Sequence, residues 1–162
     1  IVKAQLTTVH AYTATQNLVD GPAKKDVRRG RAAAVNIVPS TTGAAQSVVE
    51  VIPDLQGKLD GLALRVPVIC GSITDLVAEV EKSVTVEEVN AAFTKEAAGR
   101  LKGILAVSSE GLVSSDIIGT TYSAIVDLPL TRVIGGNLVK VLAWYDNEWA
   151  YAQRLVDVAK IL

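Results

Sequence analysis

Between residues 104 and 144 the chain contains short, apolar, strand-like runs that follow one another without a helical pattern between them. Strands in such a succession pair most readily as antiparallel neighbours, because a parallel pair needs a long crossover connection, usually a helix. A tight hairpin is indicated at Gly135-Gly136-Asn137. The expected runs are 104–107, 112–115, 123–126, 131–134 and 138–144. This succession excludes strict βαβ alternation and favours an α+β fold.

The remaining segments supply further strands and the helices. Strands are expected over 2–10, 62–68 and 72–81, and helices over 42–51, 85–98 and about 147–162. Thr85 and Glu88 have the spacing of a capping box at the start of the second helix. The predicted fold is a mostly antiparallel mixed sheet with about three helices packed on one face. Residues 1–162 form one domain, in which 13–36 is a long polar loop of the kind that usually carries function.

Charge and composition narrow the function classes. The net charge of −1 gives no general attraction to nucleic acid or to an anionic membrane, although basic residues cluster between Lys24 and Arg31. No apolar run approaches the roughly 20 residues that a membrane span needs. The single cysteine cannot form an internal disulfide, which favours a cytoplasmic setting. The chain starts inside a strand pattern without a methionine, so we expect it to be the C-terminal part of a longer protein.

His10 is the best candidate for chemistry. It is the only histidine, ends the first predicted strand and is surrounded by threonine and tyrosine hydroxyls. An imidazole can take a proton from a thiol or hydroxyl near neutral pH and return it to an intermediate. The alternative is a strand-end histidine whose ring is satisfied by the neighbouring hydroxyls. Spacing alone leaves both interpretations open.

Several residues could bind an anion. Thr42 and Gly43 stand where a helix is expected to begin, and the free backbone N–H groups there suit a phosphate. A plain helix cap is the alternative. Arg65 lies in an otherwise apolar strand, so its guanidinium must meet either a carboxylate or a ligand phosphate. Thr13 and Thr15 complete the anion-site candidates.

The other features are less specific. Cys70 has no basic partner that would lower its pKa, which indicates a buried structural thiol. One histidine and one cysteine make a poor ligand set, so no metal site is predicted. The aromatic-polar segment 144–151 is either a core corner or a lip over a planar ligand. The chain contains no Gly-rich nucleotide-binding fingerprint.

Four longer segments together resemble the catalytic domain of glyceraldehyde-3-phosphate dehydrogenases, and the resemblance runs in order from Ile1 to Leu162. The segments are TTVHAYTATQ (7–16), RAAAVNIVPSTTGAA (31–45), LRVPV (64–68) and WYDNEW (144–149). The resemblance implies the glycolytic oxidation of glyceraldehyde 3-phosphate with NAD and inorganic phosphate. The product would be 1,3-bisphosphoglycerate, formed through a thiohemiacetal and a thioester. It also implies a homo-oligomer, a tetramer in the intact protein.

The resemblance assigns roles to individual residues. His10 would form the catalytic thiolate and assist hydride departure, and Asn147 would bind the nicotinamide carboxamide with Tyr151 nearby. Residues 13–36 would be the S-loop, which packs against a neighbouring subunit near its cofactor, and Pro22 in it would suit NAD. The phosphate ligands would be Thr13, Thr15 and Arg65 for the substrate, and Thr42 and Gly43 for inorganic phosphate.

The resemblance also has departures. The family's nucleophilic cysteine and its Rossmann domain, which binds most of the dinucleotide, would both lie upstream of Ile1. We therefore expect the isolated chain to be inactive and to need its N-terminal domain as a partner. Ala150 replaces a usual glycine at a helix start, where it should be tolerated.

Two other functions remain open at this point. Erythrose-4-phosphate dehydrogenase shares the layout, and a non-catalytic assembly or phosphate-binding module could keep the fold. The joint presence of His10, Arg65, Thr42 and Asn147 argues against the second, because assembly alone does not need all four.

Overall fold

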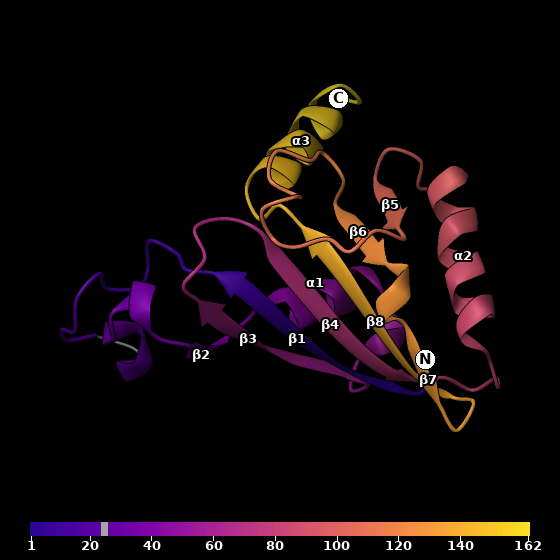
Figure 1. The fold of residues 1–162 in the computed structure, drawn as a ribbon, viewed down its shortest axis with the longest axis horizontal. Coiled ribbons are helices and arrows are strands. Elements are labelled where there is room, and N and C mark those ends of the chain that lie inside the picture. The colour runs from indigo at the N-terminus through magenta and orange to yellow at the C-terminus, as the bar shows by residue number, and fades with distance from the viewer. Residues whose placement is uncertain (24–25) are drawn as a thin grey trace.

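The computed structural model describes residues 1–23 and 26–162, so Lys24 and Lys25 of the basic cluster lie outside the described residues. Its centre is one mixed sheet of eight strands in the order β2-β3-β1-β4-β8-β6-β5, with β7 also paired to β8. Figure 1 shows the long central strands side by side. The strands are β1 Lys3–Ala11, β2 Val38–Thr41, β3 Leu59–Val66, β4 Ser72–Glu79, β5 Leu105–Ser108, β6 Ala124–Asp127, β7 Arg132–Ile134 and β8 Leu138–Tyr145.

The pairing confirms a mostly antiparallel mixed sheet. Only β1 with β3 and β5 with β6 run parallel, whereas the other five pairings are antiparallel. Gly135 and Gly136 both have positive φ in the turn between β7 and β8. That conformation suits glycine and explains the hairpin at this position.

Three α-helices accompany the sheet: α1 Ala44–Val51, α2 Val86–Ala98 and α3 Trp149–Ala159. Thr85 caps α2 by accepting from the backbone N–H of Glu88, while the Glu88 carboxylate accepts from the Thr85 N–H. This confirms the predicted capping box. Pro53 follows α1 and begins a short 3-10 turn, Pro53–Leu55, because proline cannot continue the helix.

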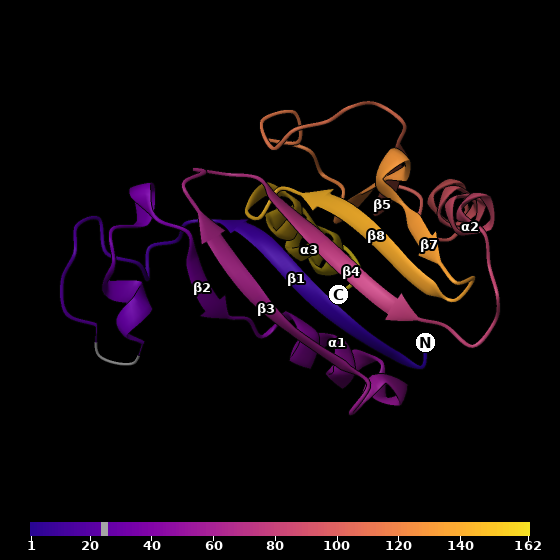
Figure 2. The ribbon, with the colours of Figure 1, turned by 60° about the horizontal axis from the view of Figure 1, so that its bottom comes forward.

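The hydrophobic core lies between the sheet and α2. Val126, Val139 and Val141 are buried there, and Val89 and Phe93 of α2 pack against them. Side chains alternate between the two faces of a strand, and the register carries this face across β8 and β4 to β1. His10 therefore projects from the face that α2 covers. It stands near the C-terminal end of β1, and Figure 2 shows that this end of the strand lies away from the β7–β8 hairpin.

Two local predictions need correction. Residues 112–115 were expected as a strand, but they belong to the irregular segment between β5 and β6. The Val113 N–H there donates to the Asp116 carboxylate at 2.7 Å, in a local turn that replaces a ladder bond. Strand β2 was not predicted, because it has only four residues and contains Pro39. Proline fits there because β2 is an edge strand.

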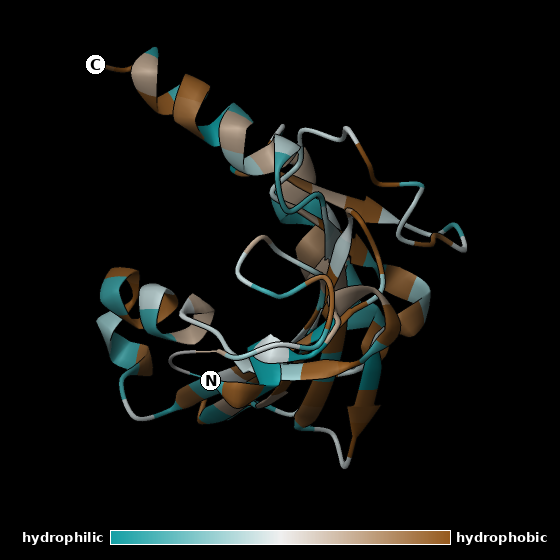
Figure 3. Cartoon of the chain, turned by 90° about the vertical axis from the view of Figure 1, so that its left-hand side faces the viewer, coloured by the Kyte–Doolittle hydropathy of each residue, from teal (hydrophilic) through white to brown (hydrophobic). Residues whose placement is uncertain are grey.

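The C-terminal helix α3 extends away from the sheet (Figure 3). Ala150 is its one buried residue, whereas Tyr151, Leu155 and Val158 are more than half exposed. Among the described residues, no helix combines the length and the apolar character that crossing a membrane requires.

Candidate active site

His10 stands next to the end of β1, opposite Arg65 on β3. Its Nδ1 lies 2.7 Å from the carbonyl oxygen of Ala11. Because a carbonyl can only accept, Nδ1 must carry the proton, which leaves the lone pair on Nε2. The ring of Tyr145 meets the imidazole edge-on, with centroids 6.2 Å apart. This geometry holds a neutral imidazole in the tautomer that a base needs.

The electrostatics of His10 favour the neutral ring. Burial lowers the pKa of His10 below 6.5, and the nearby Arg65 charge lowers it further, while the hydrogen bond to Ala11 opposes both. A group with a pKa below 6.5 is mostly unprotonated at neutral pH, so His10 can accept a proton there.

Arg65 forms no ion pair with a carboxylate of the described residues. Its Nη1 donates to the Ala11 carbonyl at 3.4 Å, which uses only one of the five guanidinium N–H groups. Burial lowers the pKa of Arg65, an effect to which the charge of Arg29 adds and which Tyr145 opposes. A half-buried guanidinium without a carboxylate partner is suited to an anionic ligand.

Thr13 and Thr15 lie in the loop that follows β1. Their hydroxyl oxygens are 3.0 Å apart, so one donates to the other and both remain at the surface. The Gln16 side-chain oxygen accepts from the Thr13 N–H at 3.1 Å, and Gln16 itself is buried. Gln16 therefore anchors the turn that presents the two hydroxyls.

Thr42 lies in a cavity of about 720 Å³ at the β2 edge. Two arginines, Arg28 and Arg29, and two carboxylates, Asp26 and Asp60, line it. Arg29 pairs with Asp26 at 3.8 Å and donates to the Ser40 hydroxyl at 3.3 Å. The Thr42 hydroxyl oxygen also accepts from the N–H of Ala44, the first residue of α1, at 3.1 Å, while the N-cap position itself is Gly43. The helix start and the two arginines would suit an anion, whereas the two carboxylates balance the arginine charges.

Asn147 follows β8 and reaches back to the start of β4. Its Oδ1 accepts from the Gly71 N–H at 3.0 Å and from the Ser72 hydroxyl at 3.2 Å. Asn147 and Tyr151 both line a cavity of about 230 Å³ beside Tyr145. Because a backbone N–H can only face the amide oxygen, the orientation of this amide is fixed. Nδ2 is then the atom of Asn147 that can donate to a carboxamide oxygen, so the residue fits the nicotinamide group.

Asp146, next to Asn147, is a buried carboxylate that joins three segments. Its oxygens accept from the N–H groups of Gly119, Glu148 and Trp149, each at 2.8 Å. Burial alone would raise the pKa of Asp146, but these donors outweigh it and the pKa is lowered. Cys70 also donates to Asp146, at 3.5 Å, and burial together with that charge raises the pKa of the thiol. The raised pKa agrees with a thiol that no basic partner activates, but Cys70 is only half-buried, so the expectation of a buried thiol was wrong.

Two predicted features lie apart from this group. The 13–36 loop, which contains Pro22, extends from the sheet edge away from α3 in both ribbon views (Figures 1 and 2). Pro22 does not line the Asn147 cavity.

Among the described residues, no group of three or more His, Cys, Asp or Glu side chains could hold a metal ion.

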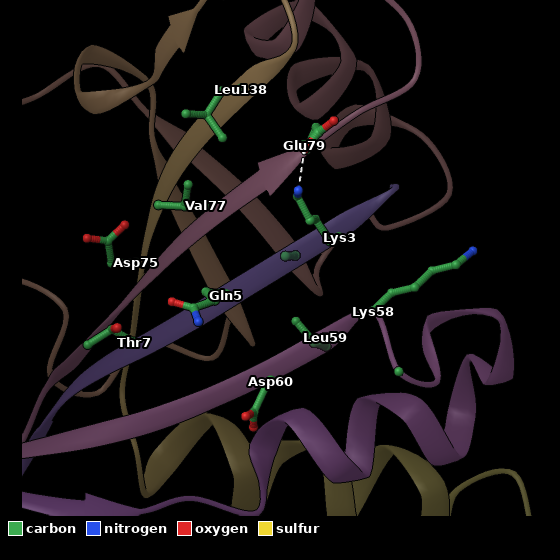
Figure 4. A pocket seen from close by; sticks show the side chains of 12 residues that line it. Lys3, Gln5, Thr7, Lys58, Leu59, Asp60, Asp75, Val77, Glu79 and Leu138 are labelled. Atoms are coloured by element: carbon green, nitrogen blue, oxygen red, sulfur yellow. Dashed lines mark ion pairs between the residues drawn. The ribbon is translucent and has the colours of Figure 1, made fainter.

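Another cavity, of about 840 Å³, lies on the other face of the sheet and includes none of the predicted site residues. Lys3, Gln5 and Thr7 of β1 line it, and Lys3 pairs with Glu79 at 3.1 Å (Figure 4). Residues 3, 5 and 7 alternate with His10 along β1, so this cavity and the imidazole are on opposite faces.

Sequence reasoning missed three residues around the site: Ser72, Tyr145 and Arg29. Ser72 is 2% exposed and contacts Asn147, which lies 75 positions later in the chain. Such a contact depends on the pairing of β4 with β8, for which the sequence gives no local signal. Arg29 had a signal in the basic cluster, but its neighbours could not be assigned without the β2 edge.

Comparison with known proteins agrees with this geometry. The chain matches the family model described as "Glyceraldehyde 3-phosphate dehydrogenase, C-terminal domain" over residues 1–147. It is similar to the proteins named glyceraldehyde-3-phosphate dehydrogenase of Haloarcula vallismortis (56% identical over 98% of the chain), Mycobacterium avium (56% over 100%) and Geobacillus stearothermophilus (57% over 98%). The matched region is 47% of each relative, so the chain spans about half their length. The chain belongs to the glyceraldehyde-3-phosphate dehydrogenase family and corresponds to its C-terminal domain.

Proposed function

We propose that this chain is the catalytic domain of a phosphorylating, NAD-dependent glyceraldehyde-3-phosphate dehydrogenase. The observation that carries the proposal is the pairing of a neutral His10, whose Nε2 keeps its lone pair, with an Arg65 that has no carboxylate partner among the described residues. A base beside an unneutralised guanidinium suits a substrate that carries both a reacting carbonyl and a phosphate.

Each residue then has a step that its geometry allows. His10 takes the proton of a cysteine thiol supplied by an upstream segment, and the thiolate adds to the aldehyde. Arg65, with Thr13 and Thr15, holds the substrate phosphate. The aldehyde oxygen takes the proton back from His10 as the thiohemiacetal forms, and His10 removes that proton again as a hydride leaves, so that a thioester remains on the sulfur. NAD, when bound, would supply the acceptor for this hydride. Asn147 orients the carboxamide of the nicotinamide ring from its fixed amide, and Tyr151 lies beside it.

We assign the second phosphate to the cavity at the β2 edge, which Arg28 and Arg29 line together with Asp26 and Asp60. Inorganic phosphate, held by Thr42 and the N–H groups at Gly43, attacks the thioester and releases the acyl phosphate. Arg29 lines this cavity and is close enough to Arg65 to lower its pKa. In this assignment Arg65 serves the substrate phosphate and Arg29 the inorganic phosphate.

The proposed partners follow from the same assignment. An N-terminal domain would supply the thiol and most of the dinucleotide site. Residues 13–36 extend from the sheet edge, where another subunit of a homo-tetramer could meet them and place Pro22 near its cofactor. We place the intact protein in the cytoplasm, where its single described cysteine would stay reduced.

The proposal is tested by NADH formation in the intact protein, meaning this chain preceded by its native upstream segment. We expect activity with glyceraldehyde 3-phosphate that requires inorganic phosphate, and no activity in the chain alone. A higher kcat/KM with erythrose 4-phosphate would instead identify the related dehydrogenase. If the intact protein forms no NADH with either sugar phosphate, the catalytic role is refuted, and a phosphate-binding or assembly module remains.

A further inference from the structure

Ser72 carries a buried hydroxyl that lies between the strand end that bears His10 and the residue proposed to bind nicotinamide, Asn147. It is the first residue of β4 and is 2% exposed. Its oxygen accepts from the N–H of Ala11 at 3.4 Å, and its hydroxyl donates to Asn147 Oδ1 at 3.2 Å. A single hydroxyl therefore connects the residue after His10 with the residue assigned to the nicotinamide.

The hydroxyl proton of Ser72 has a defined direction. Ala11 presents an N–H, which can only donate, so it occupies a lone pair of the Ser72 oxygen. The Ser72 proton is then free to point to Asn147, whose oxygen already accepts from the Gly71 N–H. Two donors on one amide oxygen strongly disfavour a flipped amide, because the flip would set NH₂ against N–H and O–H.

We propose that Ser72 is a positioning residue that fixes the Asn147 amide with its oxygen inward, so that its nitrogen is the donor offered to the cofactor carboxamide. The inference rests on the proposed function, because it uses the assignment of Asn147 to nicotinamide. Ser72 touches neither substrate nor cofactor and acts through Asn147. Tyr145 is the register partner of Ser72 in the pairing of β4 with β8, and its ring packs edge-on against His10.

The test measures dissociation constants of NAD and of ADP-ribose for the intact protein. ADP-ribose lacks the nicotinamide ring and so cannot use Asn147. For Ser72→Ala we expect NAD to bind about fivefold more weakly, the cost of one neutral hydrogen bond, while ADP-ribose binding is unchanged. The matched control is Thr131→Val, which removes a buried hydroxyl that has no partner among the described residues. It should change neither constant.

Two further variants keep the inference falsifiable. Ser72→Cys preserves the size of the side chain with a weaker donor, so it should fall between wild type and Ser72→Ala even if the alanine variant folds poorly. In an Asn147→Ala background, Ser72→Ala should have no additional effect on NAD, since nothing remains to be oriented.

The outcomes separate this inference from the proposed function. Equal weakening of NAD and ADP-ribose by Ser72→Ala would overturn the positioning role in favour of a general structural one. Selective weakening of NAD by Asn147→Ala, with no effect of Ser72→Ala, would overturn the inference alone. If Asn147→Ala leaves the ratio of the two constants unchanged, the assignment of Asn147 fails, and the role of Ser72 fails with it.

Discussion

His10 and Arg65 are register partners on the parallel strands β1 and β3, and both donate to one acceptor, the carbonyl oxygen of Ala11. The shared carbonyl fixes the imidazole tautomer and holds the guanidinium beside it without neutralising its charge. The proton acceptor and the phosphate ligand are thereby held together by backbone geometry. This relationship gives the first two predictions.

His10 should titrate below 6.5 in the folded chain, because burial and the Arg65 charge disfavour its protonated form. The unfolded chain takes up this proton near 6.5, so the free energy of unfolding should decrease as pH falls from 6.5 through the lowered pKa. As the only histidine, His10 gives a single imidazole signal that can be followed by NMR. Arg65→Ala should raise the measured pKa. A wild-type pKa at or above 6.5 would contradict the electrostatic account.

Arg65→Ala in the intact protein should raise KM for glyceraldehyde 3-phosphate about tenfold or more, because a charged hydrogen bond to phosphate is lost. Arg65→Lys should recover part of this loss, since the charge remains but the forked donor geometry does not. Steady-state kinetics with Arg100→Ala, at an exposed arginine of the segment after α2, provide the control. An unchanged KM in Arg65→Ala would remove this residue from the substrate site.

Asp146→Asn should destabilise the fold by about 1–3 kcal/mol, because an amide nitrogen would face at least one of the N–H groups that now donate to the carboxylate. The lowered pKa of Asp146 gives a second signature. The Asp146 carboxylate therefore stabilises the fold fully above the pKa of the carboxyl in the unfolded chain, about 3.9. This stabilisation is lost as the pH falls through the lower pKa of the folded chain. Urea unfolding at several pH values measures both effects, and the difference between the two proteins should shrink in acid. A difference independent of pH would contradict this role.

Gly71→Ala should destabilise the chain by about 2 kcal/mol or more through backbone strain and a steric clash. Gly71 has φ of +93°, and an added Cβ would lie 2.5 Å from the Ser114 carbonyl oxygen. Gly111→Ala is the matched control, because a Cβ there meets nothing within 4 Å. Thermal unfolding of both variants gives the comparison. Equal melting temperatures would show that the segment after β5 moves freely away from Gly71.

The sequence predicted the elements whose signals are local. The capping box at Thr85, the glycine hairpin at 135–136 and the run that ends at His10 each depend on neighbouring residues, and each is present in the structure. Residues 112–115 were wrongly expected as a strand. The apolar run does not reveal that the Asp116 carboxylate accepts a hydrogen bond from the N–H of Val113 and so forms a local turn. The edge strand β2 is too short to give a periodic signal.

The site was predictable by residue type but not by arrangement. The sequence indicated that an arginine in an apolar strand needs an anionic partner. Only the register of β1 with β3, which the sequence does not reveal, places Arg65 opposite His10. Ser72 gave no sequence signal, and Tyr145 was noted only as part of the aromatic-polar segment 144–151, because their roles arise from strands that pair across more than 60 residues. The part of the site that could not be predicted is therefore the part that depends on pairing between strands far apart in the sequence.

The central claim is that His10 is the base of the proposed dehydrogenase, and His10→Asn in the intact protein tests it most directly. Asparagine keeps a polar side chain of similar reach but accepts no proton, so kcat for NADH formation should fall about 10²- to 10⁴-fold, with KM for glyceraldehyde 3-phosphate little changed. The acid limb of the pH profile that belongs to the imidazole should disappear as well. A variant that keeps the wild-type kcat and the same acid limb would contradict the claim.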